Sequence, residues 1–262
     1  MASESKAPES SRRQKVQSAE VGTDILKGLA DLAPATSLSK LAEHLEMPAS
    51  KVHRYLQALI ASGFAEQDEA TNHYGLGPAA LYVGMAALGR LDVVKVSVPR
   101  LATLRDAVNE TCFLAVWGNH GPAVVHVEQA VRAVTLVTQV GSVLPLLSSS
   151  TGLVFNAFLP DSETAPLRKQ ALRQAGAPTQ KVLADTMASI RAHQLHSIHG
   201  LLMEGVNALS APVFAAGNRL VGVLTIVGAA QSFSAEPGSL AAQRLLETAE
   251  AISQRMGAKY TR

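Results

Sequence analysis

The stretch SLSKLAEHLEMPASKVHRYLQALIASGF, residues 37–64, contains two helical patterns separated by a short break. Ser37 precedes the first apolar positions and is expected to cap a helix there. A second helix is expected from Ala49, ending at Gly63. Its apolar residues recur at helical spacing and predict a buried stripe: Val52, Tyr55, Leu56, Leu59 and Ile60. Two such helices joined by a short turn predict a helix-turn-helix.

The flanking sequence extends this pattern to a winged helix-turn-helix over residues 18–77. Residues 18–32 have helical periodicity and stop before Pro34. After Gly63, two short extended segments flank the polar turn 68–72, which predicts a small hairpin, or wing. Residues 1–17 are almost without apolar side chains and are expected to form a disordered tail. Residues 78–97 predict a linker helix rich in Ala, Leu and Val.

Residues 98–262 predict a second domain with an α+β fold. Strands are expected at 112–117, 124–128, 134–140, 206–214 and 220–227, and helices at 101–109, 149–159, 168–175, 181–193 and 240–256. The stretch from His193 to His199 is interpreted as a helix end followed by a loop. Turn residues between neighbouring strands favour a mainly antiparallel sheet surrounded by helices.

Composition limits the class of protein more than it identifies a partner. The chain has 262 residues, 47% of them hydrophobic and 17% charged, so it can bury a sizeable core. No apolar run is long enough to span a bilayer, the amino terminus lacks the apolar core of a signal peptide, and the single cysteine fits a reducing compartment. A cytoplasmic protein without membrane contact is expected. Residues 1–80 carry eight Lys or Arg against ten Asp or Glu, which is unusual for a DNA-binding domain.

The outward side of the helix expected from Ala49 offers hydrogen-bond donors. DNA presents phosphates and acceptor-rich base edges in the major groove, so donors are the matching chemistry. The candidate DNA-binding residues on this helix are Ala49, Ser50, Lys51, His53 and Arg54, and those at the wing tip are Asn72 and His73. The alternative is a three-helix bundle whose polar side is only solvated.

Several stretches of the sequence resemble one protein family. Residues 37–64, followed by HYGLGPAAL at 73–81, are similar to the IclR-type regulators of bacteria. The resemblance continues through VPRLATLRDAVNETCFLAVW (98–117), VGSVLPLLSSSTGLVFNAFLP (140–160), GVNALSAPVF (205–214) and VGVLTIVGAA (221–230). It implies a winged helix-turn-helix, a linker helix and a GAF-like effector-binding domain. It also implies a homodimer or homotetramer that binds a double-stranded operator, with transcription regulation as its function and a small molecule as its effector.

The resemblance also implies where the effector binds. The corresponding positions here are Leu136, Leu144, Thr151, Gly152, Ile198, Val206, Ala208, Thr225 and Val227. Because Ile198, Ala208 and Val227 stand where relatives for small keto acids have polar side chains, we expect a more apolar ligand, such as an aromatic carboxylate. Free N–H groups at the helix start near Thr151 would attract an anion. Simple N-capping by Ser150 or Thr151 is the alternative.

The other groups of reactive residues do not indicate an enzyme. His193, His196 and His199 recur every third residue, which allows a zinc site or a solvated edge. Ser149, Ser150 and His126 would suit a hydrolase, but the sequence has no Gly-x-Ser-x-Gly elbow and no Asp placed to orient the histidine. Cys112 alternates with apolar strand residues and is expected to be buried. No catalytic residue, metal or cofactor is expected. Two alternatives remain: an enzyme with an accessory helix-turn-helix, and a sensor whose first domain binds protein.

Overall fold

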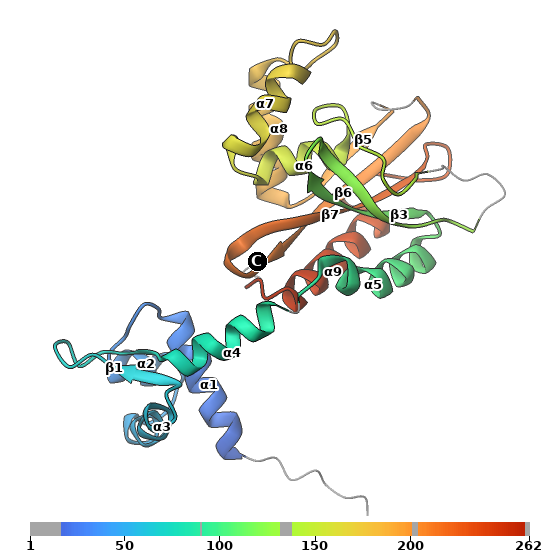
Figure 1. The fold of residues 1–262 in the computed structure, drawn as a ribbon. Helices are drawn as coiled ribbons and strands as arrows, with labels where there is room; N and C mark the ends of the chain where they lie inside the picture. Colours follow the sequence, from blue (N-terminus) through green and yellow to red (C-terminus); the bar gives the residue numbers. More distant parts are fainter. Residues whose placement is uncertain (1–16, 90, 132–137, 201–203, 260–262) are drawn as a thin grey trace, which may run out of the picture. The chain divides into compact units, whose positions relative to one another are not determined.

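The computed structural model describes residues 17–89, 91–131, 138–200 and 204–259. They form two compact units that divide after residue 90 (Figure 1). Each unit has its own hydrophobic core. Within the described ranges, no helix is both long and apolar enough to cross a membrane.

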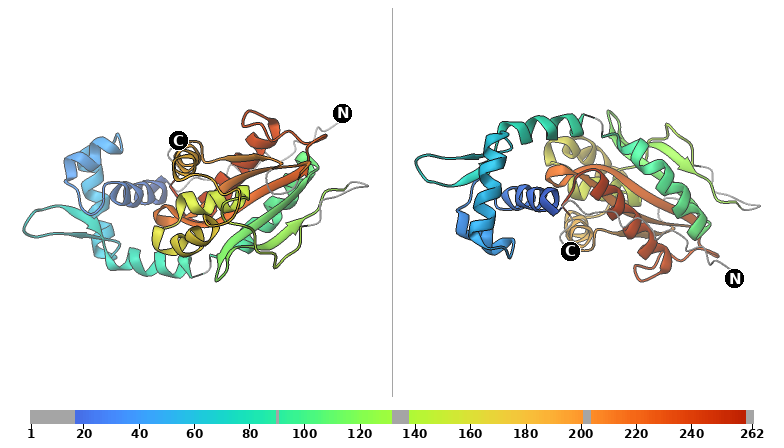
Figure 2. Two further views of the ribbon diagram at one scale, coloured as in Figure 1. Left: turned by 90° about the horizontal axis from the view of Figure 1, so that it is seen from above. Right: turned by 90° about the horizontal axis from the view of Figure 1, so that it is seen from below.

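The first unit is a helix-turn-helix with a wing, as predicted. Its helices are α1 (Gln17–Asp31), α2 (Leu38–His44) and α3 (Ala49–Ala61). Strands β1 (Ala65–Gln67) and β2 (Tyr74–Leu76) pair antiparallel and protrude as a hairpin (Figure 2). Ser37 caps α2 by accepting the Lys40 N–H at 3.4 Å. The three helices meet over Val21, Ile25, Leu29, Leu41, Val52 and Leu56.

The segment expected as one linker helix over 78–97 forms parts of two helices. α4 (Pro78–Leu88) ends at Gly89, and α5 (Val93–Val108) belongs to the second unit. Asp92 starts α5 by accepting the N–H groups of Val94 and Lys95 at 2.9 and 3.4 Å. α5 then continues through Pro99, which removes one helical hydrogen bond, the one to the carbonyl of the exposed Lys95.

The second unit contains a five-stranded antiparallel sheet. Its strands are β3 (Thr111–Gly118), β4 (Gly121–Glu128), β5 (His196–His199), β6 (Val206–Ala215) and β7 (Arg219–Ala229), in the order β4-β3-β7-β6-β5. The expectation of a loop at 196–199 was wrong, because these residues form an edge strand too short for its alternation to stand out. The expected strand at 134–140 lies mostly outside the described residues, and its described part, 138–140, is not a strand.

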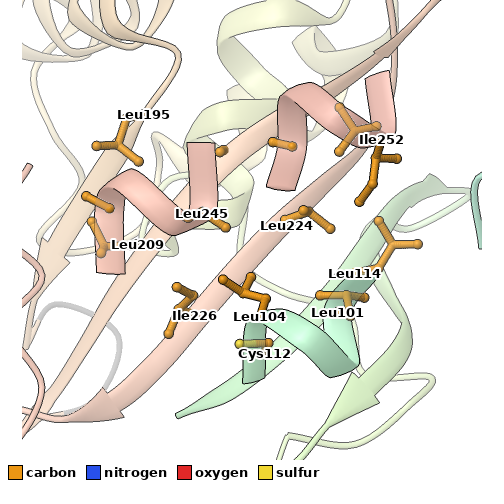
Figure 3. Packing of buried hydrophobic residues seen from close by; sticks show 14 of the residues in the cluster. Leu101, Leu104, Cys112, Leu114, Leu195, Leu209, Leu224, Ile226, Leu245 and Ile252 are labelled. Atoms are coloured by element: carbon orange, nitrogen blue, oxygen red, sulfur yellow. The ribbon is translucent and has the colours of Figure 1, made fainter. Parts of the chain in front are cut away.

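Helices cover both faces of this sheet. α5 and α9 (Leu240–Arg255) lie on one face and α6 (Ser150–Phe158) on the other, with α8 (Gln180–His193) beside α6 (Figures 1 and 2). α7 (Asp161–Ala171) begins earlier than the predicted residue 168 and ends before the predicted residue 175, and it contains Pro166. Figure 3 shows the core between α5, α9 and the sheet, built by Leu101, Leu104, Leu224, Ile226, Leu245 and Ile252.

Candidate nucleic-acid interface and ligand cavity

Helix α3 presents the predicted donors to solvent. Val52 and Leu56 are 0% exposed and fix the inward side of the helix. Ala49, Ser50, His53 and Arg54 are exposed, and Lys51 is half-buried. The first unit therefore holds these five residues on the outward side of α3 and at its amino-terminal end, as the periodicity predicted.

The net charge of α3 is positive, although the net charge of its domain is not. The helix contains no Asp or Glu. Within the described part of the chain, neither Lys51 nor Arg54 forms an ion pair, and the Arg54 guanidinium lies 5.6 Å from the centre of the Tyr55 ring. Pro48 precedes the helix and supplies no side-chain cap. The amino-terminal end of the helix and its two cations are suited to phosphate oxygens.

The wing tip is a turn held by a carboxylate. Asp68 accepts the N–H groups of Ala70 and Thr71 at 2.9 and 2.7 Å. The bonds from Thr71 lower the pKa of Asp68, so its negative charge is kept. Asn72 has a positive φ of 56°, and both Asn72 and His73 are exposed. These two predicted residues are accessible but follow a carboxylate, so α3 has the more favourable surface for DNA.

The described strand residues implied for effector binding share one face of the sheet. The register pairs Ile198 with Ala208, and Ala208 with Val227. Val206 and Thr225 lie two residues from this row on β6 and β7, so their side chains point to the same face. It is the face covered by α6. Leu136 lies outside the described residues.

Helix α6 is joined to this face by a chain of buried hydroxyl groups. Thr151 Oγ1 lies 2.8 Å from Thr225 Oγ1, which lies 2.8 Å from Ser210 Oγ. None of the three residues is more than 1% exposed. Because each hydroxyl has a partner within the chain, the three side chains fix α6 against β6 and β7.

Packing explains why position 152 is a glycine, and helix capping explains what its N–H group binds. A Cβ at this position would lie 2.3 Å from the carbonyl oxygen of Pro145, so only glycine fits without a shift. Its N–H donates to Ser149 Oγ at 2.9 Å. The capping alternative is thus what the structure shows for this amide. The cap is Ser149, and the expectation of Ser150 or Thr151 as cap was wrong.

A cavity of about 820 Å³ opens between the sheet edge, the segment before α6 and the connection from α7 to α8. Two of the predicted residues, Leu144 and Ile198, line it. The other described members of the predicted set are not among its lining residues: Thr151, Gly152, Val206, Ala208, Thr225 and Val227. Among the described residues, no Asp, Glu, Lys or Arg lines it. Its polar groups are hydroxyls, amides and imidazoles.

Sequence reasoning missed most of the cavity wall. Gln170 in the last turn of α7, the connection residues 174–178 and Thr186 on α8 all contribute to it. The residues of the connection follow no periodic pattern, because a connection takes its shape from the elements at its two ends. A polar loop alone does not reveal that it borders a cavity.

His196 is the most unusual group of the cavity. Its Nδ1 lies 3.2 Å from Ser150 Oγ, which also donates to the His196 carbonyl oxygen at 3.0 Å. Since the hydroxyl has one proton to give, the ring must carry its own proton on Nδ1. Burial lowers the pKa of His196 to about 4, so the imidazole is neutral at pH 7.

The three histidines interpreted as a zinc site or a solvated edge have different partners. His193 Nδ1 lies 2.9 Å from the Ser189 carbonyl oxygen, His196 contacts Ser150, and His199 Nε2 is 4.0 Å from Glu236 Oε1. Over the residues that the structure describes, no group of three or more His, Cys, Asp or Glu is placed to hold a metal ion.

The residues considered for a hydrolase are engaged elsewhere. His126 Nε2 pairs with Glu128 at 2.9 Å, and Ser149 Oγ donates to the Pro145 carbonyl oxygen at 2.6 Å. Cys112 is 0% exposed, which confirms the predicted burial. Burial, followed by the charge of Glu110, raises the pKa of its thiol to about 12. It is a protonated core residue at neutral pH.

Comparison with known proteins agrees with this architecture. The sequence profile of the IclR helix-turn-helix domain matches residues 18–69, and that of the bacterial transcriptional regulator IclR C-terminal domain matches residues 85–254. Among solved structures, the crystal structure of Pseudomonas aeruginosa HmgR matches with a TM-score of 0.85 and a sequence identity of 67%. The match covers 94% of this chain and 100% of the HmgR chain.

Curated relatives match over most of their length. The HTH-type transcriptional regulator KipR of Bacillus subtilis is 27% identical over 229 residues, 86% of this chain and 91% of KipR. The HTH-type transcriptional repressor AllR of Klebsiella pneumoniae is 25% identical over 255 residues, 96% of this chain and 94% of AllR.

A helix-turn-helix unit joined to an α/β unit of this type defines a DNA-binding transcription regulator. The chain belongs to the IclR family of bacterial transcriptional regulators, which is not known to contain enzymes.

Proposed function

We propose that this regulator controls a catabolic or related operon in response to a small organic acid, with an aromatic carboxylate as the favoured class of effector. The observation that carries the DNA half of this proposal is the outward side of α3. It combines two cations that form no ion pair with any described residue, an amino terminus without a side-chain cap and no acidic side chain. Lys51 and Arg54 would bind phosphates or base edges, with Ala49, Ser50 and His53 beside them and Asn72 and His73 at the wing.

The cavity beside α6 supports the effector half. Its volume, about 820 Å³, lies in the range of small-molecule sites. Leu144, Leu183 and Ile198 provide apolar wall, while Ser148 and Thr186 provide hydroxyl donors. An effector with a ring and one polar end matches this lining better than a small keto acid. Binding would regulate DNA affinity only through different affinities for two states of the protein.

A band-shift titration tests both halves together. The DNA is the promoter region upstream of the chain's own gene, and benzoate is compared with pyruvate as a candidate effector. The variant Ala177→Phe fills the cavity, and Ala188→Phe, on an exposed position of α8 outside the lining, is its matched control. The proposal expects benzoate to change operator affinity in the parent and in Ala188→Phe, but not in Ala177→Phe. A response to pyruvate alone would reject the aromatic class of effector.

Helix α4 supports the proposal of a homo-oligomer. Four large apolar side chains on it are exposed: Leu81 at 67%, Tyr82 at 77%, Val83 at 52% and Met85 at 59%. Apolar surface gathered on one helix is typical of an interface. Because these side chains are exposed, Leu81→Glu with Tyr82→Glu should leave the folded chain intact and lower its mass in sedimentation velocity. An unchanged mass would contradict α4 as the interface.

A further inference from the structure

A second cavity, of about 640 Å³, lies at the other end of α6. The first cavity borders the amino-terminal side of this helix, whereas the second is lined by Phe155 and Phe158 at its carboxyl-terminal side. Trp117 at the end of β3 and Leu220 at the start of β7 complete an apolar wall. Among the residues that the structure describes, none lines both cavities.

Three aromatic side chains, Trp117, Phe155 and Phe158, contribute to that wall beside aliphatic ones. The Trp117 and Phe155 rings lie 5.6 Å apart, centre to centre, with an interplanar angle of 47°. Phe158 meets Phe214 edge to face at 5.1 Å, which holds its ring in position. Trp117 and Phe158 are half-buried, so part of each ring remains available to a ligand. A flat aromatic ring is the group that such a wall binds best.

One cation of the lining, Arg219, is suited to a negative charge on that ring. Arg219 is exposed at the mouth and has no ion pair with any residue in the described ranges. Pro160, which also lines the cavity, immediately precedes α7, whose first turn carries the acidic residues Asp161 and Glu163. The acidic side chain of the lining is Glu163, which is exposed to solvent. Asp161, next to the helix start, is paired with Arg168.

We propose that this cavity is a second binding site, for a planar aromatic carboxylate whose ring packs on Trp117 and Phe158 and whose carboxylate binds the Arg219 guanidinium. A guanidinium suits this role because its planar fork matches a carboxylate. Leu91 and Val93, the first part of the second unit, also line the cavity. An occupant therefore contacts the segment that follows the connection to the DNA-binding unit. The site is separate from the cavity proposed for the effector.

The single tryptophan of the chain makes the site directly observable, because Trp117 lines this cavity and not the first one. Benzoate, benzyl alcohol and benzylamine carry the same ring with negative, zero and positive charge, and each is titrated against the fluorescence of the full chain. We expect a saturable change with benzoate, roughly tenfold weaker binding of benzyl alcohol, and still weaker binding of benzylamine.

Variants decide where the signal originates. Arg219→Gln should weaken benzoate roughly tenfold and leave benzyl alcohol unchanged, whereas Arg173→Gln, an exposed arginine outside the cavity lining, should change neither. Ala177→Phe, which fills the first cavity, should leave the Trp117 signal intact. The proposal is overturned if benzoate gives no saturable change, if benzylamine binds more tightly, or if Ala177→Phe abolishes a signal that Arg219→Gln preserves.

Discussion

Replacement of Thr225 by valine isolates the buried hydroxyl chain, because the two side chains have nearly the same shape. The change removes both 2.8 Å contacts, to Thr151 and to Ser210, and opens no cavity. It leaves two hydroxyls without this partner in places that are at most 1% exposed. With about 1 kcal/mol for each lost bond and a further desolvation cost for each orphaned group, the expected loss is about 2–4 kcal/mol. For a unit of this size, the melting temperature should fall by roughly 5–15 °C.

The assay is urea unfolding of the full chain followed by Trp117 fluorescence, which reports the second unit because it is the only tryptophan. The matched control is the triple variant Thr151→Val, Ser210→Ala and Thr225→Val, in which no hydroxyl is left without a partner. Since the triple variant removes all three hydroxyl groups together, it should recover at least half of the stability that Thr225→Val loses. The reasoning is refuted if Thr225→Val unfolds within ~0.5 kcal/mol of the parent, or if the triple variant is no more stable than the single one.

Three further predictions concern single residues. Gly152→Ala should lower the free energy of unfolding by about 1–3 kcal/mol in urea titration, whereas Gly22→Ala, where a Cβ meets nothing within 4 Å, should not. The pKa of His196 in the folded protein lies below its unfolded value, so its contribution to stability is complete above pH 6.5 and is lost as the pH falls toward 4. The variant His196→Asn should therefore show a weaker dependence of the melting temperature on pH between pH 7 and 4. Cys112 should react with a thiol reagent only when urea unfolds the chain, and rapid reaction of the folded protein would contradict its burial.

The first unit could be predicted almost completely from sequence because its signals are local. Ser37 as a cap, the apolar stripe of α3 and the turn of the wing each depend on residues close together in the chain. The outward side of α3 follows directly, because burial of Val52 and Leu56 determines where Lys51 and Arg54 point.

The second unit was harder where structure depends on distant partners. β5 is a strand because Ile198 pairs with Ala208 on β6, which its four residues alone do not indicate. The first cavity is bounded by the connection between α7 and α8, which no local pattern marks. The expected anion site at Gly152 was an incomplete interpretation, because the amide is already bound by Ser149.

The central claim is that α3 binds the DNA backbone and bases, and the salt dependence of operator affinity tests it most directly. The slope of log K against log salt concentration is measured for the parent, for Lys51→Ala with Arg54→Ala, and for the exposed control pair Lys169→Ala with Arg173→Ala. If both α3 residues neutralise phosphates, the first variant should bind more weakly with a slope smaller by about 1.8, and the control should match the parent. Parental affinity and slope in the α3 variant would contradict the claim.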